Sequence, residues 1–234
     1  TKHHFDLAQD LMVRAALLRL GPRRHVLVVN VHHIASDGWS LRILVRELTI
    51  LYRAFSEGAP SPLPDLLIQY SDFAQWQRDR LTNEVQEKHL SYWRRQLEGA
   101  PALLQLPTDH PRRAVFGQQG TTVSRDLPLQ LSGRLAELSR KEGVTIFTTL
   151  LAAFQTLLFR HTASNDIPIG SPMAGRGILA LEGLIGMFTN TVVLRGRLSG
   201  NWSFRTLLQH TREVVLEADA HQDLPFDRLV RDLQ

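Results

Sequence analysis

The sequence predicts a mixed α/β protein of the α/β or α+β layered type, in which helices cover small sheets. Two observations support this class. β-rich runs and amphipathic helical patterns are interspersed along the 234 residues, and the earliest runs carry the cues of an antiparallel hairpin. Apolar residues make up 43% of the chain, which is enough to bury a core.

The first half of the chain predicts a hairpin followed by helices. Residues 12–20 and 25–31 are β-rich runs joined by the turn sequence GPRR, which is typical of an antiparallel hairpin. Residues 40–57 carry apolar side chains three and four positions apart, so we expect an amphipathic helix that ends at Gly58. A long helical pattern follows over residues 70–97.

The second half continues the mixed pattern after a segment rich in Pro and Gly, residues 99–120, which we interpret as the boundary between two lobes. The elements predicted beyond it are a strand near 121–127, helices near 129–142 and 145–161, strands near 166–171 and 189–198, and a helix near 203–219. The chain starts with Thr1 and stops within the helical pattern FDRLVRDLQ. We therefore expect an internal piece of a longer protein.

Composition argues against several classes of protein. The formal net charge is +4 and the basic residues are scattered, so no stripe suggests a nucleic-acid partner. The absence of Cys excludes disulfides, a Cys nucleophile and thiolate metal sites, and it suits a cytoplasmic protein. No apolar run approaches the roughly 18 residues of a membrane span, and no signal-peptide pattern opens the chain. We expect neither nucleic acid nor membrane as a partner.

Chemistry-bearing residues gather in VVNVHHIASDGWSLRILVREL, residues 28–48, between a predicted strand and a predicted helix. Successive strand residues point to opposite faces, so His32 and His33 would not share one site. No further His or carboxylate cluster completes a ligand set, so we expect no metal ion.

The helix after the histidines begins with residues that suit an anion site. Asp37 and Ser40 are N-cap residue types, so the loop leads into the positive end of a helix. Gly38 has no side chain, so its N–H can approach a substrate oxygen closely. A neutral imidazole beside such N–H groups suits acyl transfer. The alternative is that the histidines are ordinary strand-end residues and that Asp37 only caps the helix.

Four stretches resemble motifs of the condensation domains of nonribosomal peptide synthetases, in the chloramphenicol-acetyltransferase-like superfamily. HHIASDGWS matches the His-His-x-x-x-Asp-Gly motif of that family. The other three follow in the family's order: YSDFAQW (70–76), IGMFTNTVVLR (185–195) and HQDLPFDRLV (221–230). Gly175 stands where the family more often has Asn, and Thr189 where Val is common. We expect neither departure to touch the proposed chemistry.

The resemblance implies a two-lobed fold in which each lobe is a sheet covered by helices, here truncated at both ends. Residues 1–100 would form the C-terminal part of the N-lobe with the histidine loop, and residues 101–234 most of the C-lobe. The activity implied is peptide-bond formation between a donor acyl or peptidyl thioester and an acceptor aminoacyl thioester. The DGWS ending resembles domains that join an L-donor to an L-acceptor.

The partners implied by the resemblance are the upstream and downstream peptidyl carrier domains and the adjacent adenylation domain of the same assembly line. Each substrate would be carried on the 4′-phosphopantetheine of a carrier protein, and no cofactor would bind directly. Two alternatives stay open: a related acyltransferase that forms an ester, and a non-catalytic piece that docks carrier proteins. We expect the 234-residue chain by itself to be inactive, and poorly soluble or dimeric.

The resemblance also assigns roles within the loop. His33 would face the tunnel between the lobes as a general base or a hydrogen-bonding positioner, and Gly38 would offer its N–H to the oxyanion. The supporting residues would be His32, Trp39 and Ser40, through packing and hydrogen bonds.

Asp37 has two possible roles. It could orient His33, as the acid does in a hydrolase triad, or it could anchor the loop through an ion pair with an Arg. The resemblance favours the ion pair, with Arg176 or an Arg outside this chain as the partner. Asn190 could line the tunnel or satisfy backbone groups.

One helical face in the second motif is more simply explained by packing. The spacing of Tyr70, Phe73 and Trp76 places all three side chains on that face, and we expect them in the core.

Overall fold

The computed structural model describes residues 4–110 and 120–233. The chain divides into two compact units: unit 1 comprises Thr1–Glu87 and Pro172–Asn190, and unit 2 comprises Lys88–Ser171 and Thr191–Gln234. These bounds do not coincide with the predicted lobes 1–100 and 101–234, because a later segment returns to unit 1. The assignment to family lobes stays a prediction, and residues 111–119 of the predicted boundary lie outside the described residues.

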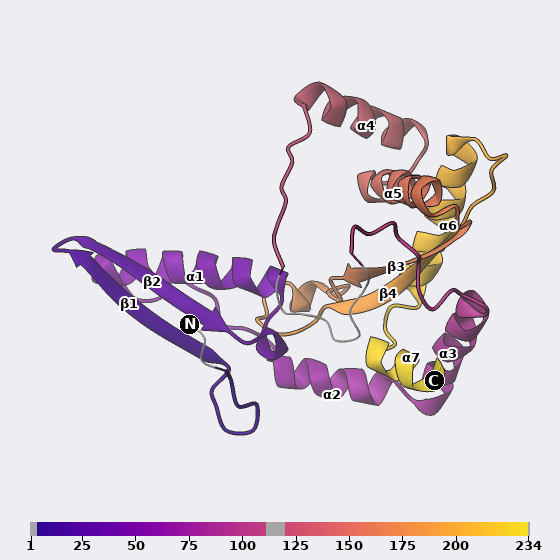
Figure 1. Cartoon of the computed structure of the whole chain (residues 1–234). Helices are drawn as coiled ribbons and strands as arrows, with labels where there is room; N and C mark the ends of the chain where they lie inside the picture. The colour runs from indigo at the N-terminus through magenta and orange to yellow at the C-terminus, as the bar shows by residue number, and fades with distance from the viewer. Residues whose placement is uncertain (1–3, 111–119, 234) are drawn as a thin grey trace. The chain divides into compact units, whose positions relative to one another are not determined.

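Unit 1 opens with the predicted hairpin. Strand β1 (Val13–Gly21) pairs antiparallel with strand β2 (Arg24–Val31) (Figure 1). The register sets Val13 opposite Val31. The register is irregular at the turn, between Arg19 and Gly21. The hairpin confirms the prediction from the two β-rich runs, and its end delivers the chain directly into the histidine loop.

Helix α1 (Gly38–Ser56) confirms the predicted helix at 40–57 and starts two residues earlier. A one-turn 3₁₀ helix, η1 (His33–Ala35), separates β2 from α1 and was not predicted. The Asp37 side chain caps α1 by accepting the Ser40 N–H, which satisfies a backbone donor that a helix start leaves open. The loop is therefore bounded by a strand end on one side and a capped helix on the other.

The single long helix predicted over 70–97 is wrong, because the structure has α2 (Tyr70–Arg80) and α3 (Asn83–Leu97) in its place. Leu81 leaves the helical region at φ −80° and ψ 59°. Thr82 then starts the next helix: its hydroxyl oxygen accepts the Val85 N–H at 3.4 Å. A Thr in this position competes for backbone hydrogen bonds and favours a helix start over a helix interior.

The core of unit 1 is a small apolar cluster around the aromatic residues of α2. Its buried members are Phe73, Leu181, Leu184 and Phe188, with Ile68 packed against them. Of the three aromatic residues predicted for the core, only Phe73 is buried. The other two, Tyr70 and Trp76, are 37% and 40% exposed and contact Phe73 from the edge of the cluster.

Two glycines in unit 1 lie where the backbone leaves no room for a side chain. Gly175 has φ +63°, and a Cβ there would lie 2.1 Å from the Phe188 carbonyl oxygen. At Gly186 a Cβ would lie 2.1 Å from the Tyr70 ring. The segment 175–188 therefore packs tightly against α2 at Gly186, and its first residue packs against its last, Phe188.

Unit 2 contains most of α3, a two-stranded sheet and four further helices. The strands are β3 (Asp166–Met173) and β4 (Asn190–Arg197), whose last and first residues respectively fall in unit 1. The helices are α4 (Leu129–Lys141), α5 (Ile146–Thr162), α6 (Phe204–Ala220) and α7 (Phe226–Leu233). These elements confirm the mixed α/β class. No single described helix is long and apolar enough to cross a membrane; α4 and α5 pass that test only as a pair bent by 104°.

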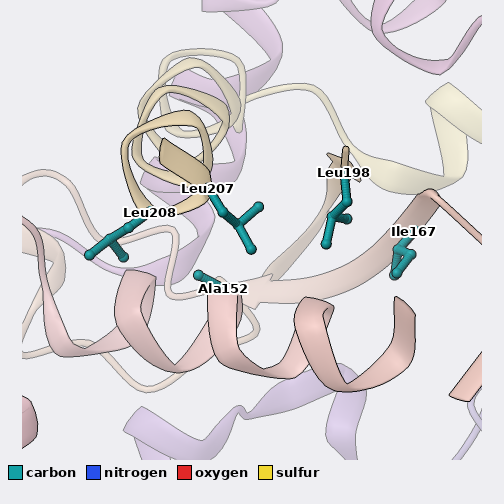
Figure 2. Packing of buried hydrophobic residues seen from close by; sticks show 5 residues of the cluster. All are labelled: Ala152, Ile167, Leu198, Leu207 and Leu208. Atoms are coloured by element: carbon teal, nitrogen blue, oxygen red, sulfur yellow. The ribbon is translucent and has the colours of Figure 1, made fainter. Parts of the chain in front are cut away.

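The core of unit 2 lies between α5, α6 and the strands. Figure 2 shows Ala152 on α5 facing Leu207 and Leu208 of α6, with Ile167 and Leu198 completing the cluster. All five side chains are at most 8% exposed. Helices α5 and α6 therefore form the apolar centre of this unit.

The strand predicted near 121–127 is wrong. Residues 120–128 have no regular secondary structure and are exposed, with Val123 77% exposed. Among the described residues the strands form only the pairs β1–β2 and β3–β4. A short β-rich run without a neighbouring strand leaves its backbone groups to water and gains nothing from extended pairing.

A buried arginine ties the sheet of unit 2 to the end of α3. Arg195 is 3% exposed and forms a two-pronged pair with Asp166, at 2.8 Å from Nε and 2.5 Å from Nη2. Its Nη1 donates to the carbonyl oxygens of Gln96 and Glu98, just where α3 ends. Hydrogen bonding to the Asp166 carboxylate raises the pKa of Arg195, so the guanidinium stays protonated.

We expect Arg195→Met to lower the free energy of unfolding by about 3–5 kcal/mol, because it leaves a carboxylate and two carbonyl oxygens without their donor. Urea unfolding of the protein measures this change. Arg197→Met, at an exposed position of the same strand, is the matched control and should change stability by less than about 0.5 kcal/mol. Equal losses in the two variants would contradict the anchoring role of Arg195.

Candidate functional site

The first histidine of the pair holds the loop together locally. His32 precedes η1, and its Nδ1 accepts the Ile34 N–H at 3.0 Å. That acceptor role leaves the ring proton on Nε2. The ring also packs edge-on against Phe5, with centroids 5.5 Å apart. His32 is thus half-buried and engaged on its Nδ1 side.

The second histidine is exposed, and its tautomer follows from one contact. Nδ1 of His33 lies 2.7 Å from the Ser36 carbonyl oxygen. A carbonyl oxygen only accepts, so Nδ1 must carry the proton. In the neutral ring Nε2 then has a free lone pair. The one-turn helix η1 creates this geometry. It turns the backbone so that the Ser36 carbonyl lies beside the ring of His33, three residues before it in the sequence.

The Asp37 carboxylate is buried and collects donors from two segments of unit 1. Its Oδ1 accepts the Ser40 N–H and hydroxyl, both at 2.8 Å. Its Oδ2 accepts the Phe188 N–H at 3.1 Å and lies 3.4 Å from the Thr189 hydroxyl. The expectation that Thr189 stands apart from this chemistry is therefore wrong, because the hydroxyl of Thr189, which Val would lack, reaches the carboxylate.

Arg176 completes the network. Its Nη2 lies 3.3 Å from Asp37 Oδ1 and donates to the Ser40 hydroxyl oxygen at 2.9 Å. Its Nη1 donates to the carbonyl oxygens of Leu181 and Leu184, at 2.5 and 2.8 Å. Both charged side chains are 1% exposed. Of the two partners considered for Asp37, the structure therefore provides Arg176.

Ser40 links the loop to the returning segment through a hydroxyl that is fully buried. The oxygen accepts from Arg176 and from the Gly186 N–H at 3.1 Å. Its single proton lies within reach of both Asp37 Oδ1 and the Gly186 carbonyl, each 2.8 Å away. The sequence suggested Ser40 as a cap residue, and the family resemblance suggested it as a supporting residue of the loop. Its link to residues 176–186 depends on side chains that meet across more than 130 positions.

The balance of forces on Asp37 keeps it ionised. Burial alone would raise the pKa of the carboxyl group, but hydrogen bonds from Ser40 and Phe188 and the charge of Arg176 outweigh that effect and hold the pKa below its ordinary value. The carboxylate is thus fully engaged by these donors. The His33 Nδ1–H meanwhile goes to the Ser36 carbonyl.

Trp39 and Gly38 stand at the first turn of α1. The Trp39 indole N–H donates to the Glu182 carbonyl at 3.0 Å, and its ring centroid lies 5.8 Å from the Arg176 guanidinium carbon. Gly38 is exposed, and apart from its chain neighbours and the nearby backbone of its own helix, no atom lies within 4 Å of the position that a Cβ would take. Nothing in the described part of the chain requires glycine there, in contrast to Gly175 and Gly186.

The remaining predicted residue lies apart in the chain from this loop. Asn190 is the first residue of β4 and is half-buried, and its tunnel role stays a prediction. The sequence did not predict the backbone groups that join the site, which belong to Leu181, Leu184 and Phe188. Every residue carries such main-chain donors and acceptors, so the residue type gives no signal for them. Within residues 4–110 and 120–233, no group of three or more His, Asp or Glu side chains is arranged to hold a metal ion.

Comparisons with known proteins place these features in a family. A family model described as Condensation domain matches residues 1–234. One linear gramicidin synthase protein of Brevibacillus parabrevis is 52% identical over 230 residues. The X-domain from teicoplanin biosynthesis, solved alone and in complex with OxyB, is 30% identical with a TM-score of 0.86. The first condensation domain of the calcium-dependent antibiotic synthetase, solved with a substrate analogue, is 25% identical with a TM-score of 0.77.

The matches cover nearly all of this chain but only part of each relative. The chain is matched over 98% of its length by the gramicidin synthase protein, of which it spans 4%. It is matched over 97% and 95% by the X-domain and the antibiotic-synthetase domain, of which it spans 52% and 51%. The structural likeness confirms the predicted chloramphenicol-acetyltransferase-like fold class. With a family model matched over its whole length, the chain belongs to the condensation-domain family.

Proposed function

We propose that this chain supplies the histidine loop of a domain that condenses a donor acyl or peptidyl thioester with an acceptor aminoacyl thioester. The observation that carries the proposal is the arrangement at His33. Its Nδ1–H is held by the Ser36 carbonyl, and the imidazole therefore presents a free Nε2 lone pair from an exposed position beside the first turn of α1. Membership in the condensation-domain family supports the reaction class.

The proposed step is nucleophilic acyl transfer. The acceptor amine nitrogen attacks the donor carbonyl carbon, a C–N bond forms, and the C–S bond of the donor thioester breaks. The proton lost by the amine passes to His33 Nε2 and from there to the departing thiolate. An α-amino group with a pKa near 8 is already about one-tenth neutral at pH 7. The reaction therefore needs little basicity from His33, and its larger contribution is to position the amine. Nε2 can act both as a base and as a hydrogen-bond acceptor that positions the amine.

Gly38 is proposed to stabilise the oxyanion formed on the attacked carbonyl oxygen. Its N–H belongs to the first residue of α1, where backbone donors have no acceptor within the helix. The positive end of the helix adds to the attraction. The open space beside Gly38 would allow a substrate oxygen to approach the backbone without meeting a side chain.

Asp37 is proposed to anchor the loop through Arg176. The donors that surround its carboxylate come from Ser40, Arg176 and the backbone of Phe188. An orienting acid would instead be expected on the Nδ1 side of His33, where the Ser36 carbonyl stands. His32, Trp39 and Ser40 support the same loop through the contacts described above.

The finer features of the function rest on the family resemblance. We propose an L-donor and an L-acceptor, both delivered on the 4′-phosphopantetheine of flanking carrier domains, with an adenylation domain in the same assembly line. Neither an organic cofactor nor a metal enters the proposed step. An ester-forming acyltransferase would use the same loop with an alcohol in place of the amine.

A docking role without catalysis is the second candidate, because the similar X-domain forms a complex with OxyB. The complete domain, mixed with loaded donor and acceptor carriers, separates the candidates. Formation of a dipeptidyl thioester supports condensation, and carrier binding without product supports docking. For the 234-residue chain alone we expect no product, since Leu17, Tyr52 and Phe55 are among many large apolar side chains left more than half exposed.

In the complete domain, His33→Ala should lower the rate of condensation by about 10²–10⁴-fold, the usual contribution of a general acid–base group. Carrier binding should stay unchanged, because the ring lies on the loop and supports no core. Single-turnover formation of the dipeptidyl thioester measures the rate. His25→Ala, at an exposed position of β2, is the control and should retain full activity. An equal loss in both variants would refute a specific role for His33.

Asp37→Ala should lower the free energy of unfolding by about 3–5 kcal/mol, because it leaves the Arg176 charge buried without its partner. The double variant Asp37→Asn with Arg176→Met should be less destabilised than Asp37→Ala, since neither charge remains. Asp79→Ala, an exposed carboxylate on α2, is the control. An inactive Asp37→Ala with unchanged stability would instead favour the orienting role.

The buried Asp37 carboxylate also predicts that the folded state loses stability at low pH. Its pKa is depressed in the folded state, so its contribution to stability is present above the unfolded value of 3.8 and is lost as pH falls below it. The Asp37→Asn variant should therefore lose less stability than the unmodified protein on acidification below about pH 4.

Gly38→Ala should leave the melting temperature unchanged or slightly raised, because the new methyl group meets no protein atom and Ala favours a helix. Condensation should fall by about a hundredfold if the methyl group displaces the substrate oxygen by about 1 Å. Gly186→Ala is the matched contrast: it should cost about 1–3 kcal/mol of stability by overpacking against Tyr70. Full activity in Gly38→Ala would remove Gly38 from the site.

A further inference from the structure

Three side chains of α3 hold His221, the residue at which α6 ends. Nδ1 of His89 lies 3.0 Å from Nδ1 of His221. The His221 ring stacks on Tyr92, with centroids 3.9 Å apart and an interplanar angle of 3°. The Trp93 indole N–H donates to the His221 carbonyl at 3.2 Å. The end of α6 is thus fixed to α3 mainly through one imidazole, within unit 2.

The contact between the two histidines depends on the number of protons they hold. Two imidazole nitrogens at 3.0 Å form a hydrogen bond only if one carries a proton and the other a lone pair. A neutral pair meets this condition when one ring carries its proton on Nδ1 and the other on Nε2. When both rings are charged, both Nδ1 atoms become donors, and the contact changes from a hydrogen bond to a repulsion between like charges.

We propose that His89 and His221 form an acid-sensitive contact that holds α3 to the end of α6 and releases it when both rings are protonated. This inference goes beyond peptide-bond formation and does not depend on it. The two histidines lie outside the histidine loop, and His221 is the first residue of the HQDLPFDRLV stretch.

The surrounding charges oppose the added proton. Burial lowers the pKa of His221 most, and His89, Lys88 and Arg95 on α3 lower it further; Glu217 on α6 acts in the opposite direction. A base whose pKa is depressed in the folded state binds protons more readily when unfolded. Stability is therefore full above the unfolded value of 6.5 and falls as pH drops below it.

Histidine Cε1 resonances of the complete domain, followed by NMR through a pH titration, test the proposal. We expect the His221 midpoint below its ordinary value in the unmodified protein and closer to that value in His89→Gln, because a like charge has been removed. His161→Gln, at an exposed position in the last turn of α5, should leave the His221 midpoint unchanged. A midpoint that stays or falls in His89→Gln would overturn the proposal, since it would show that His89 does not oppose the second proton.

Thermal unfolding gives an independent measure. The melting temperature of the unmodified protein should fall by several degrees between about pH 7.5 and about pH 5.5, the range in which histidines titrate. The fall should be clearly smaller in His221→Gln, and His161→Gln should behave like the unmodified protein. An identical fall in all three proteins would count against the contact. If His221→Gln does not fold, the NMR titration of His89→Gln decides alone.

Discussion

The ion pair of Asp37 and Arg176 sets the geometry of the histidine loop, because two charges removed from water must each find several partners. The carboxylate finds them at the start of α1 and in the backbone near Phe188. The guanidinium finds them in carbonyl groups of residues 181 and 184. If any one of these segments moved, a buried charge would lose a partner at a cost of several kcal/mol. The ion pair and its hydrogen bonds therefore hold the loop against these segments.

This constraint separates two tasks that a hydrolase triad combines in one acid. Ser36 supplies the acceptor that selects the His33 tautomer, and it does so with a backbone carbonyl. Asp37 acts on the main chain and on Arg176. A substitution that replaced the carboxylate would then disturb the position of the imidazole without changing which nitrogen carries its proton. In a triad, replacing the acid by its amide changes the tautomer itself.

Much of this could be predicted from the sequence, and the failures have physical causes. Elements with strong local patterns, such as the hairpin and α1, were predicted to within one or two residues. The break at Leu81 was missed because one Thr cap outweighs an apolar spacing that continues across it. The strand near 121–127 was overpredicted because β propensity says nothing about whether a partner strand is present.

The candidate site shows the same division between local and distant information. The histidine motif identified the residues of the loop. Arg176 could only be offered as one of two partners for Asp37, because the contact joins positions 139 residues apart. The contact of Thr189 with the Asp37 carboxylate has no sequence signal for the same reason. The contacts of His221 with α3 had no sequence signal, since they depend on ring stacking between residues far apart in the chain.

The distance in sequence between the two halves of the Asp37 network also matters for synthesis on the ribosome. Asp37 and Thr189 are separated by 152 positions. At about 5–20 residues per second, the loop waits on the order of 8–30 s after Asp37 is translated before its last partner exists. During that interval Asp37 cannot be buried with its full set of donors, so the histidine loop is solvated in the nascent chain. The loop can reach its final geometry only after most of unit 2 has been translated.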